Sequence, residues 1–313
     1  MKTCLVTGGK GFIGSHLIDF LVKKGHYVRC VDIKPRSILV TGENEFICGD
    51  LRQFHAAYSA LQGIDWVFNL AANMGGIGYI TELNAPIMRD NALINLNILE
   101  AARIMDTERI FYSSSACAYN RELQENEDCE PLKESDVLPA YPDSAYGWEK
   151  LFSEFVYKSF EHDYGLKVRI ARFHNIYGSH CVFEGGQEKA PAALCHKVFH
   201  GKDSMFVWGD GKQTRSFLHV SDCIDAVYRL MEGSFSDPVN VGTSYLISID
   251  DLALMIQKIA GKSLEITHQL AKPQGVRGRN ADISLAKRLL DWAPKVSLES
   301  GMKQLYDWIA LMH

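Results

Sequence analysis

The sequence TCLVTGGKGFIG occupies residues 3–14 and sets the architecture of the first half of the chain. Its first five residues are apolar or β-branched and predict a short strand. Three glycines come next at spacings of three, and then an amphipathic segment extends to Lys24. A strand, a glycine turn and a helix in this order begin a βαβ unit, and the helix N-terminus offers free N–H groups to a pyrophosphate. The predicted phosphate-binding residues are Gly8, Gly11, Phe12, Ile13 and Gly14.

The second predicted strand, residues 27–31, ends in Asp32. An acid at this point accepts hydrogen bonds from an adenosine ribose and repels a 2'-phosphate, which favours NAD over NADP. Lys34 and Arg36 come shortly after it and act against this preference.

Strands and helices continue to alternate up to about residue 177. Strands are predicted at 46–48, 66–70, 110–113 and 168–173, and long helices at 87–105 and 145–164. This alternation predicts an α/β fold with a doubly wound parallel Rossmann-type sheet. We expect an NAD-binding domain at 1–177 and a smaller, mostly substrate-binding domain at 178–313, with a helix at 220–232 that packs back on the first.

Further ligand contacts are expected at the carboxyl ends of these strands, where open parallel sheets bind ligands. The predicted cofactor contacts there are Asp50, Leu51, Leu70, Ala71 and Ala72. Residues 74–78, MGGIG, are predicted to form a flexible glycine loop at the same edge.

Residues 113–150 carry the predicted chemistry. Tyr146 and Lys150 are one helical turn apart, and an ammonium at that position lowers the pKa of a phenol. Ser115 lies at a strand end, where it can hydrogen-bond the same substrate hydroxyl. The three side chains suit removal of a proton from an alcohol as its hydride leaves, although a Tyr-x-x-x-Lys pair alone is common on ordinary helices.

Composition excludes several other classes of protein. The 313 residues are 47% hydrophobic and 23% charged with a net charge of -5, so no basic field invites nucleic acid. No apolar run has the length of a membrane helix, and the N-terminus is predicted to be a strand, not a signal peptide. The 8 cysteines lack metal-ligand spacing, so we expect free thiols, no metal and a cytoplasmic location.

The motifs TGGKGFIGSHL, NLAA, NALINLNILEAAR, SSSACAY, YGWEK and RFHNIYG resemble those of the extended short-chain dehydrogenase/reductase (NAD-dependent epimerase/dehydratase) family. The resemblance implies NAD retained through the cycle, a homodimer built on the two long helices and a C-terminal sugar-nucleotide domain. AANMGGIGYI, GGQEKAPAA, WGDGKQTRSF and GVRGRN resemble the members that invert two carbons of a GDP-mannose-type sugar nucleotide.

The resemblance also implies roles for single residues. Tyr146 would be the oxidation base, Lys150 would hold the nicotinamide ribose, and Cys117 and Lys189 would form a proton-transfer pair. Contacts to the sugar or the GDP are implied for Gly75, Ser115, Ala116, Asn175, Glu188, Ala190, Lys197, Gln213, Thr214, Arg215 and Arg279.

Transient oxidation at C4 explains why such groups are needed, because a ketone there makes the hydrogens on C3 and C5 acidic. A nucleotide-sugar 4,6-dehydratase, a 4-epimerase and a catalytically silent NAD-binding sensor or scaffold remain as alternatives. A 4-epimerase would not need Cys117 or Lys189, and a silent protein would not need the Tyr146/Lys150 pair. His174, at a strand end, is interpreted as a packed core residue.

Overall fold

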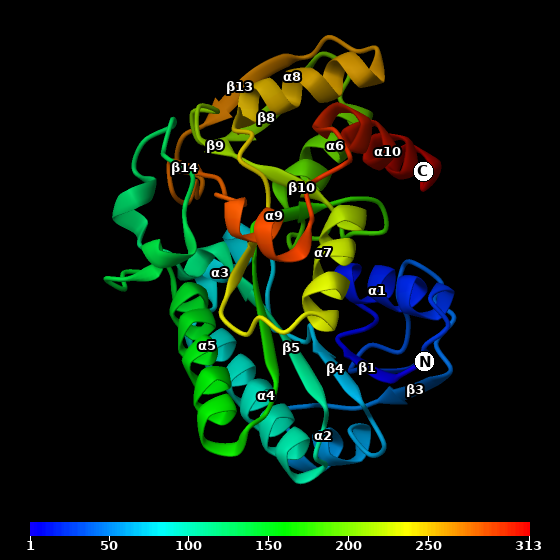
Figure 1. Cartoon of the computed structure of the whole chain (residues 1–313). Helices are drawn as coiled ribbons and strands as arrows, with labels where there is room; N and C mark the ends of the chain where they lie inside the picture. The colour runs from blue at the N-terminus through cyan, green and yellow to red at the C-terminus, as the bar shows by residue number, and fades with distance from the viewer.

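A computed structural model describes residues 1–313, and seven parallel strands form its central sheet (Figure 1). The strand order is β11-β6-β5-β4-β1-β2-β3, which confirms the predicted doubly wound sheet. The order reverses between β1 and β4, so a ligand crevice is expected at their carboxyl ends. The strands are β1 (Thr3–Thr7), β2 (Tyr27–Asp32), β3 (Glu45–Cys48), β4 (Trp66–Asn69), β5 (Arg109–Ser115), β6 (Val168–Phe173) and β11 (Val239–Val241).

Helices cover both faces of this sheet (Figure 1). On one face α1 (Phe12–Lys23) packs with α7 (Val220–Glu232), and their leucine, isoleucine and valine side chains share one buried cluster with β1, β2 and β4. On the other face α2 (Phe54–Ala60), α4 (Asn84–Ile104) and α5 (Ala145–Tyr164) bury a second cluster. Both α7 and β11 therefore lie with the large sheet, although they come from the second half of the chain.

The remaining elements form a smaller lobe with its own core (Figure 1). Its helices are α6 (Ala190–His200), α8 (Ile249–Ala260) and α10 (Leu298–Leu311), packed beside the parallel pair β8 (Ser204–Trp208) and β13 (Glu265–Gln269). Two short sheets complete the fold. One consists of β12 (Ile247–Ser248), β9 (Thr214–Arg215) and β14 (Gly278–Arg279), and the other pairs β7 (Asn175–Tyr177) with β10 (Phe217–His219). Helix α9 (Ser284–Leu290) packs on the first core.

Two local features differ from the sequence prediction. Helix α4 begins at Asn84, three residues early, because a proline in its first turn needs no intrahelical N–H bond. The glycine segment 74–78 is not a loop throughout, since α3 (Ile77–Glu82) begins inside it. Residues 116–137 contain three short 3-10 turns, Ala116–Ala118, Arg121–Gln124 and Glu134–Val137. None of the helices is both long and apolar enough to cross a bilayer.

Candidate active site

The glycine turn after β1 forms a cradle that side chains would fill. Gly8 has φ +64°, and a Cβ there would lie 2.9 Å from the backbone of Ala71. A Cβ on Gly14 would lie 2.3 Å from the carbonyl oxygen of Gly8. The first turn of α1 leaves its N–H groups, including those of Phe12 and Ile13, without intrahelical acceptors. The cradle therefore fits a pyrophosphate.

Asp32 is fixed by the two loops beside it. Its Oδ2 accepts from the backbone N–H of Lys10 at 2.9 Å, and its Oδ1 accepts from that of Lys34 at 2.8 Å. The ammonium of Lys10 pairs with Glu43, so its charge is already compensated. The side chains of Lys34 and Arg36 are exposed, and neither forms an ion pair with Asp32, which leaves an acid at the ribose end of the cradle.

The other predicted cofactor contacts lie at neighbouring strand ends. The N–H groups of Leu70 and Ala71 each donate to Thr7 Oγ1 at 3.1 Å, which ties the end of β4 to β1, and Ala72 is half-buried beside them. Leu51 is buried, whereas Asp50 forms an ion pair with Arg52 at 2.7 Å. Asp50 is thus engaged by a neighbouring side chain.

Tyr146 and Cys117 are brought together by a glycine. A Cβ on Gly147 would lie 2.1 Å from the carbonyl oxygen of Cys117, so α5 can start against this turn only because residue 147 has no side chain. Ser144 caps the helix by accepting from Gly147 N–H at 3.2 Å. Tyr146 is buried in an apolar cluster with Ile80, and Cys117 packs against that cluster.

Ser115 and Lys150 complete the predicted trio. Ser115, the last residue of β5, accepts from the N–H of Cys117 at 3.1 Å, and its hydroxyl also interacts with Tyr146. Lys150 is buried, donates to the carbonyl oxygen of Ser113 at 2.9 Å and lies 5.6 Å from the ring centre of Tyr146. Burial lowers the pKa of Lys150, and the charges of neighbouring carboxylates oppose this effect.

The pKa of Tyr146 differs from the sequence expectation. Burial raises it, the charges of Cys117 and Glu149 raise it further, and only the hydrogen bond with Ser115 lowers it. Lys150 does not compensate, because its ammonium is directed at a backbone carbonyl. A positive nicotinamide ring would act in the opposite direction to burial. A phenolate at this position therefore depends on the positive charge of the oxidised cofactor.

Lys189 reaches this region through a second glycine contact. The N–H of Gly76 donates to the carbonyl of Gln187 at 3.1 Å, and a Cβ on Gly76 would lie 2.4 Å from the carbonyl oxygen of Glu188. The side chain of Glu188 accepts from the N–H of Gly186 at 2.7 Å. Burial lowers the pKa of Lys189, and the charge of Cys117 acts on it in the opposite direction. The thiol and the amine thus share one electrostatic environment.

Arg279, which is buried, and Arg215, which is half-buried, lie side by side because β14 pairs with β9, with Arg279 opposite Arg215. Arg279 donates to Cys117 Sγ at 3.2 Å and to Asp143 Oδ2 at 2.8 Å. Arg215 donates only to backbone carbonyls, including those of Thr214 and Val276 at 2.7 Å. Burial lowers the pKa of Arg215 to about 10, and the neighbouring Arg279 lowers it too. With one carboxylate for two guanidinium groups, this end of the site is suited to an anion.

Several predicted substrate contacts donate to backbone carbonyls instead of projecting freely. Asn175 donates to Ser216 at 2.9 Å, Lys197 to Phe206 at 3.0 Å and Gln213 to Trp208 at 2.9 Å. No hydrogen bond or ion pair links these three side chains to Tyr146. Four further residues were predicted to contact the substrate. The hydroxyl of Thr214 donates to the carbonyl of Glu127, and Ala116 is buried. Gly75 lies against the ring of Tyr79, and Ala190 is the first residue of α6.

Sequence reasoning missed two residues beside Cys117. Asp143 and Gln124 both bond to the guanidinium of Arg279, but they lie in a stretch with many acidic and polar residues. No spacing distinguishes them there, so only the fold identifies them. His174 is buried and its Nε2 lies 3.2 Å from Asn240 Oδ1, which agrees with its interpretation as a core residue.

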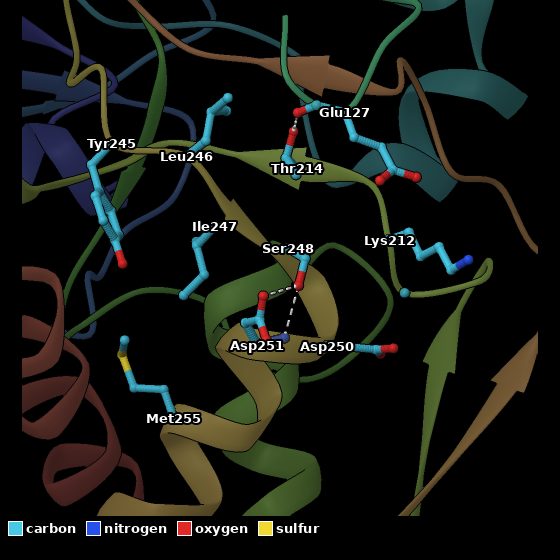
Figure 2. A pocket seen from close by; sticks show the side chains of 11 residues that line it. Glu127, Lys212, Thr214, Tyr245, Leu246, Ile247, Ser248, Asp250, Asp251 and Met255 are labelled. Carbon is cyan, nitrogen blue, oxygen red and sulfur yellow. Dashed lines mark hydrogen bonds between the residues drawn. The ribbon is translucent and has the colours of Figure 1, made fainter.

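A pocket of about 610 Å³ opens elsewhere, between β9, β12 and the start of α8 (Figure 2). Glu127, Asp250 and Asp251 contribute three carboxylates to its lining against the single ammonium of Lys212. Such a lining disfavours a diphosphate. It includes Thr214, a predicted substrate contact, but none of the predicted catalytic residues.

Comparison with known proteins identifies the family to which the chain belongs. The model of the NAD dependent epimerase/dehydratase family matches residues 4–242. The chain belongs to this family. The matched residues include the glycine cradle, Asp32, the trio of Ser115, Tyr146 and Lys150, and Lys189.

Relatives within the family are similar over nearly the whole chain. GDP-mannose 3,5-epimerase 1 of Oryza sativa subsp. japonica and GDP-mannose 3,5-epimerase of Arabidopsis thaliana are each 44% identical over 306 residues. The alignments cover 97% of this chain and 80% and 81% of those proteins. UDP-glucuronic acid decarboxylase 1 of Arabidopsis thaliana is 29% identical over 96% of this chain and 68% of its own.

Solved structures of the family have the same fold. UDP-glucose 4-epimerase of Thermotoga maritima with UDP-glucose has a TM-score of 0.90 at 27% identity and covers 99% of both chains. UDP-glucuronic acid 4-epimerase of Bacillus cereus, in complex with UDP-glucuronic acid and NAD, has a TM-score of 0.86 at 28% identity and covers 99% of this chain and 100% of its own. The expectations of an enzyme and of NAD as cofactor are thereby confirmed: the chain is an NAD-dependent enzyme of the nucleotide-sugar epimerase/dehydratase type.

Proposed function

We propose that this protein is a GDP-mannose 3,5-epimerase, which converts GDP-D-mannose to GDP-L-galactose with some GDP-L-gulose from inversion at C5 alone. The packing of Cys117 against the buried cluster that contains Tyr146 carries the proposal. It puts a group able to exchange protons beside the residue proposed to oxidise C4, and a 4-epimerase has no need for it. The 44% identity to the two plant 3,5-epimerases supports the same choice.

The first proposed step is removal of the C4 hydroxyl proton by Tyr146, with Ser115 holding that hydroxyl. Bound NAD would supply a reversible hydride acceptor. Lys150, 5.6 Å from the ring centre of Tyr146, would hold the nicotinamide ribose. The same residues return the proton to the C4 oxygen when the ketone is reduced again.

Cys117 and Lys189 then invert C5 and C3 of the ketone. One removes a proton from one face of the ring and the other returns a proton to the opposite face. The lowered pKa of Lys189 suits this exchange, because a lysine that loses its proton more easily can act as a base. The proposal leaves open which of the two side chains is the base at each carbon.

Arg215 and Arg279 are proposed to bind the diphosphate of the substrate, with Lys197, Gln213, Thr214, Asn175 and Glu188 at its two ends. The uncompensated guanidinium charge of the arginine pair supports this assignment, since guanidinium binds phosphate oxygens in bidentate fashion. Residues 178–313, apart from α7 and β11, would form the substrate lobe. The free thiols of all eight cysteines support a reducing compartment such as the cytoplasm.

Incubation with GDP-mannose in deuterated water tests the proposal. The expected products, identified by NMR, carry the L-galacto and L-gulo configurations, with deuterium at C5 and C3. Tyr146→Phe should abolish all products, whereas Cys117→Ser should stop deuterium uptake while C4 is still oxidised. Inversion at C4 without deuterium, loss of water, release of CO2 from UDP-glucuronic acid, or no turnover of any nucleotide sugar would each contradict it.

A further inference from the structure

Three histidines outside the active site converge on the surface of the smaller lobe. His196 and His200 belong to α6, and His313 comes after α10. Their ring centres are 4.6 Å apart for His196 and His200, 5.4 Å for His196 and His313, and 4.7 Å for His200 and His313. One nitrogen from each ring lies within 4.8 Å of the others. His196 is half-buried and the other two are exposed.

The fold explains why these rings meet. His196 and His200 are separated by four residues, so they project from one face of α6. Helix α10 packs along α6 through a shared core that includes Leu194, Val198 and Ile309, and it delivers His313 to the same face. Helix α6 thus sets the spacing of His196 and His200, and α10 brings the segment that carries His313 next to them.

The surroundings suit a cation held by imidazoles, because a carboxylate lies beside the rings. Glu184 Oε2 lies 4.0 Å from His196 Nε2 and offers a fourth ligand. In a tetrahedral site with bonds of about 2.0–2.1 Å the nitrogens approach each other to about 3.4 Å, which the exposed rings of His200 and His313 can reach by rotation.

We propose that His196, His200 and His313 form a site for one zinc-type divalent transition metal ion, which clamps α6 to the segment after α10. Zinc, nickel and copper accept imidazole ligands, whereas magnesium and calcium prefer a shell of oxygen ligands. Lys189 precedes the other end of α6, about 16 Å from His200 along the helix axis. The ion therefore acts on the stability of the lobe and takes no part in the sugar chemistry.

Zinc binding to the NAD-loaded protein, prepared without a polyhistidine tag, tests the site. Calorimetric titration with Zn²⁺ should give one ion per chain. Zinc at 100 times its dissociation constant should raise Tm by about 5 °C, because the ion binds the folded state alone. His200→Ala and His313→Ala should each weaken binding at least tenfold and, at the same zinc concentration, reduce the Tm increase to about half or less, with the metal-free Tm unchanged.

His55→Ala is the matched control, since His55 is also exposed but lies on α2. It should bind zinc as the parent does. The proposal is overturned if the parent shows no saturable zinc binding, if His200→Ala and His313→Ala keep the parent's affinity, or if His55→Ala weakens binding as much as they do. Turnover of GDP-mannose is a separate readout, so the metal site and the proposed function can fail independently.

Discussion

Arg279 donates a hydrogen bond to the sulfur of Cys117 over 3.2 Å, and its other terminal nitrogen donates to Asp143 over 2.8 Å. The guanidinium comes from β14 in the lobe, and the thiol comes from the turn after β5 of the large sheet. One buried side chain thus joins the proposed diphosphate site to the proposed proton-transfer site. A positive charge at this position stabilises any negative charge that develops on the sulfur.

Replacing the guanidinium with an ammonium should separate these two effects. Arg279→Lys keeps the positive charge but cannot bond to Cys117, Asp143 and Gln124 together, because only the planar fork has donors in all three directions. We expect deuterium exchange at C5 and C3 to fall about 100-fold, a loss typical of one misplaced catalytic donor. Mass spectrometry of GDP-mannose incubated in deuterated water measures it.

Arg277→Lys is the control for that variant. Arg277 also forms two ion pairs, with Asp210 and Glu127, but it lies outside the Cys117 site. It should keep exchange within about threefold of the parent, since partly exposed ion pairs contribute little. Equal losses in the two variants would mean that Arg279 acts only through the stability of the lobe.

The close approach of α5 to the Cys117 turn predicts a steep response to one methyl group. In Gly147→Ala the new Cβ would meet the carbonyl oxygen of Cys117 at 2.1 Å, so the turn and the helix must move apart. Overpacking of this kind costs about 1–3 kcal/mol, and a shift of Tyr146 should reduce kcat/KM about 100-fold. Thermal unfolding and steady-state kinetics measure the two effects.

Gly42→Ala provides the comparison, because its nearest neighbour would be 3.9 Å from the new Cβ. That variant should unfold and turn over as the parent does. A Gly147→Ala protein with unchanged kcat/KM would show that the Tyr146–Cys117 approach is not needed for catalysis.

The sheet and its cofactor edge could be predicted from the sequence because their signals are local. A glycine turn between a strand and a helix, or an acid at the end of β2, has one structural meaning within a few residues. The helix carrying Tyr146 and Lys150 is predictable from its own periodicity in the same way. These elements need no knowledge of distant partners.

The surroundings of Cys117 could not be predicted because they depend on contacts across the chain. Asp143 and Arg279 are 136 residues apart in sequence, and the β14–β9 pairing that places Arg279 involves only two residues in each strand. The prediction of a lowered pKa for Tyr146 is wrong for a related reason. The phenol is buried and Lys150 points toward Ser113 only once the chain has packed. The spacing of Tyr146 and Lys150 in the sequence shows neither feature.

The lowered pKa of Lys189 predicts how activity depends on pH. If its neutral amine takes part in proton exchange, the rate should rise with pH and level off below about 10.4, the value for a free lysine. Lys189→Arg keeps a positive charge that does not dissociate, so exchange should fall at least 100-fold at every pH. Exchange rates between pH 6 and 10 distinguish the variant from the parent, and a rise in the variant that matches the parent's would exclude Lys189 as the titrating group.

The lowered pKa of Lys189 should also make the stability of the protein depend on pH. Because burial lowers the folded-state pKa of Lys189, the unfolded chain binds more protons between that value and about 10.4. The free energy of unfolding should therefore increase with pH across this window, and the increase should be smaller in Lys189→Met. Urea unfolding at several pH values measures it, and equal slopes for both proteins would contradict the buried-charge explanation.

The apolar side chains on the outer faces of α4 and α5 predict that two copies associate there. Leu93 and Leu96 of α4 are each 40% exposed, and Phe152 and Phe155 of α5 are 49% and 58% exposed, on two helices that lie side by side (Figure 1). An apolar surface of this kind is typical of an interface between subunits. Phe155→Glu places a charge at its centre and should convert a dimer to a monomer, as measured by light scattering during size-exclusion chromatography. Leu254→Glu, equally exposed at 52% but on α8, should remain dimeric, and a Phe155→Glu protein that keeps the mass of a dimer would place the interface elsewhere.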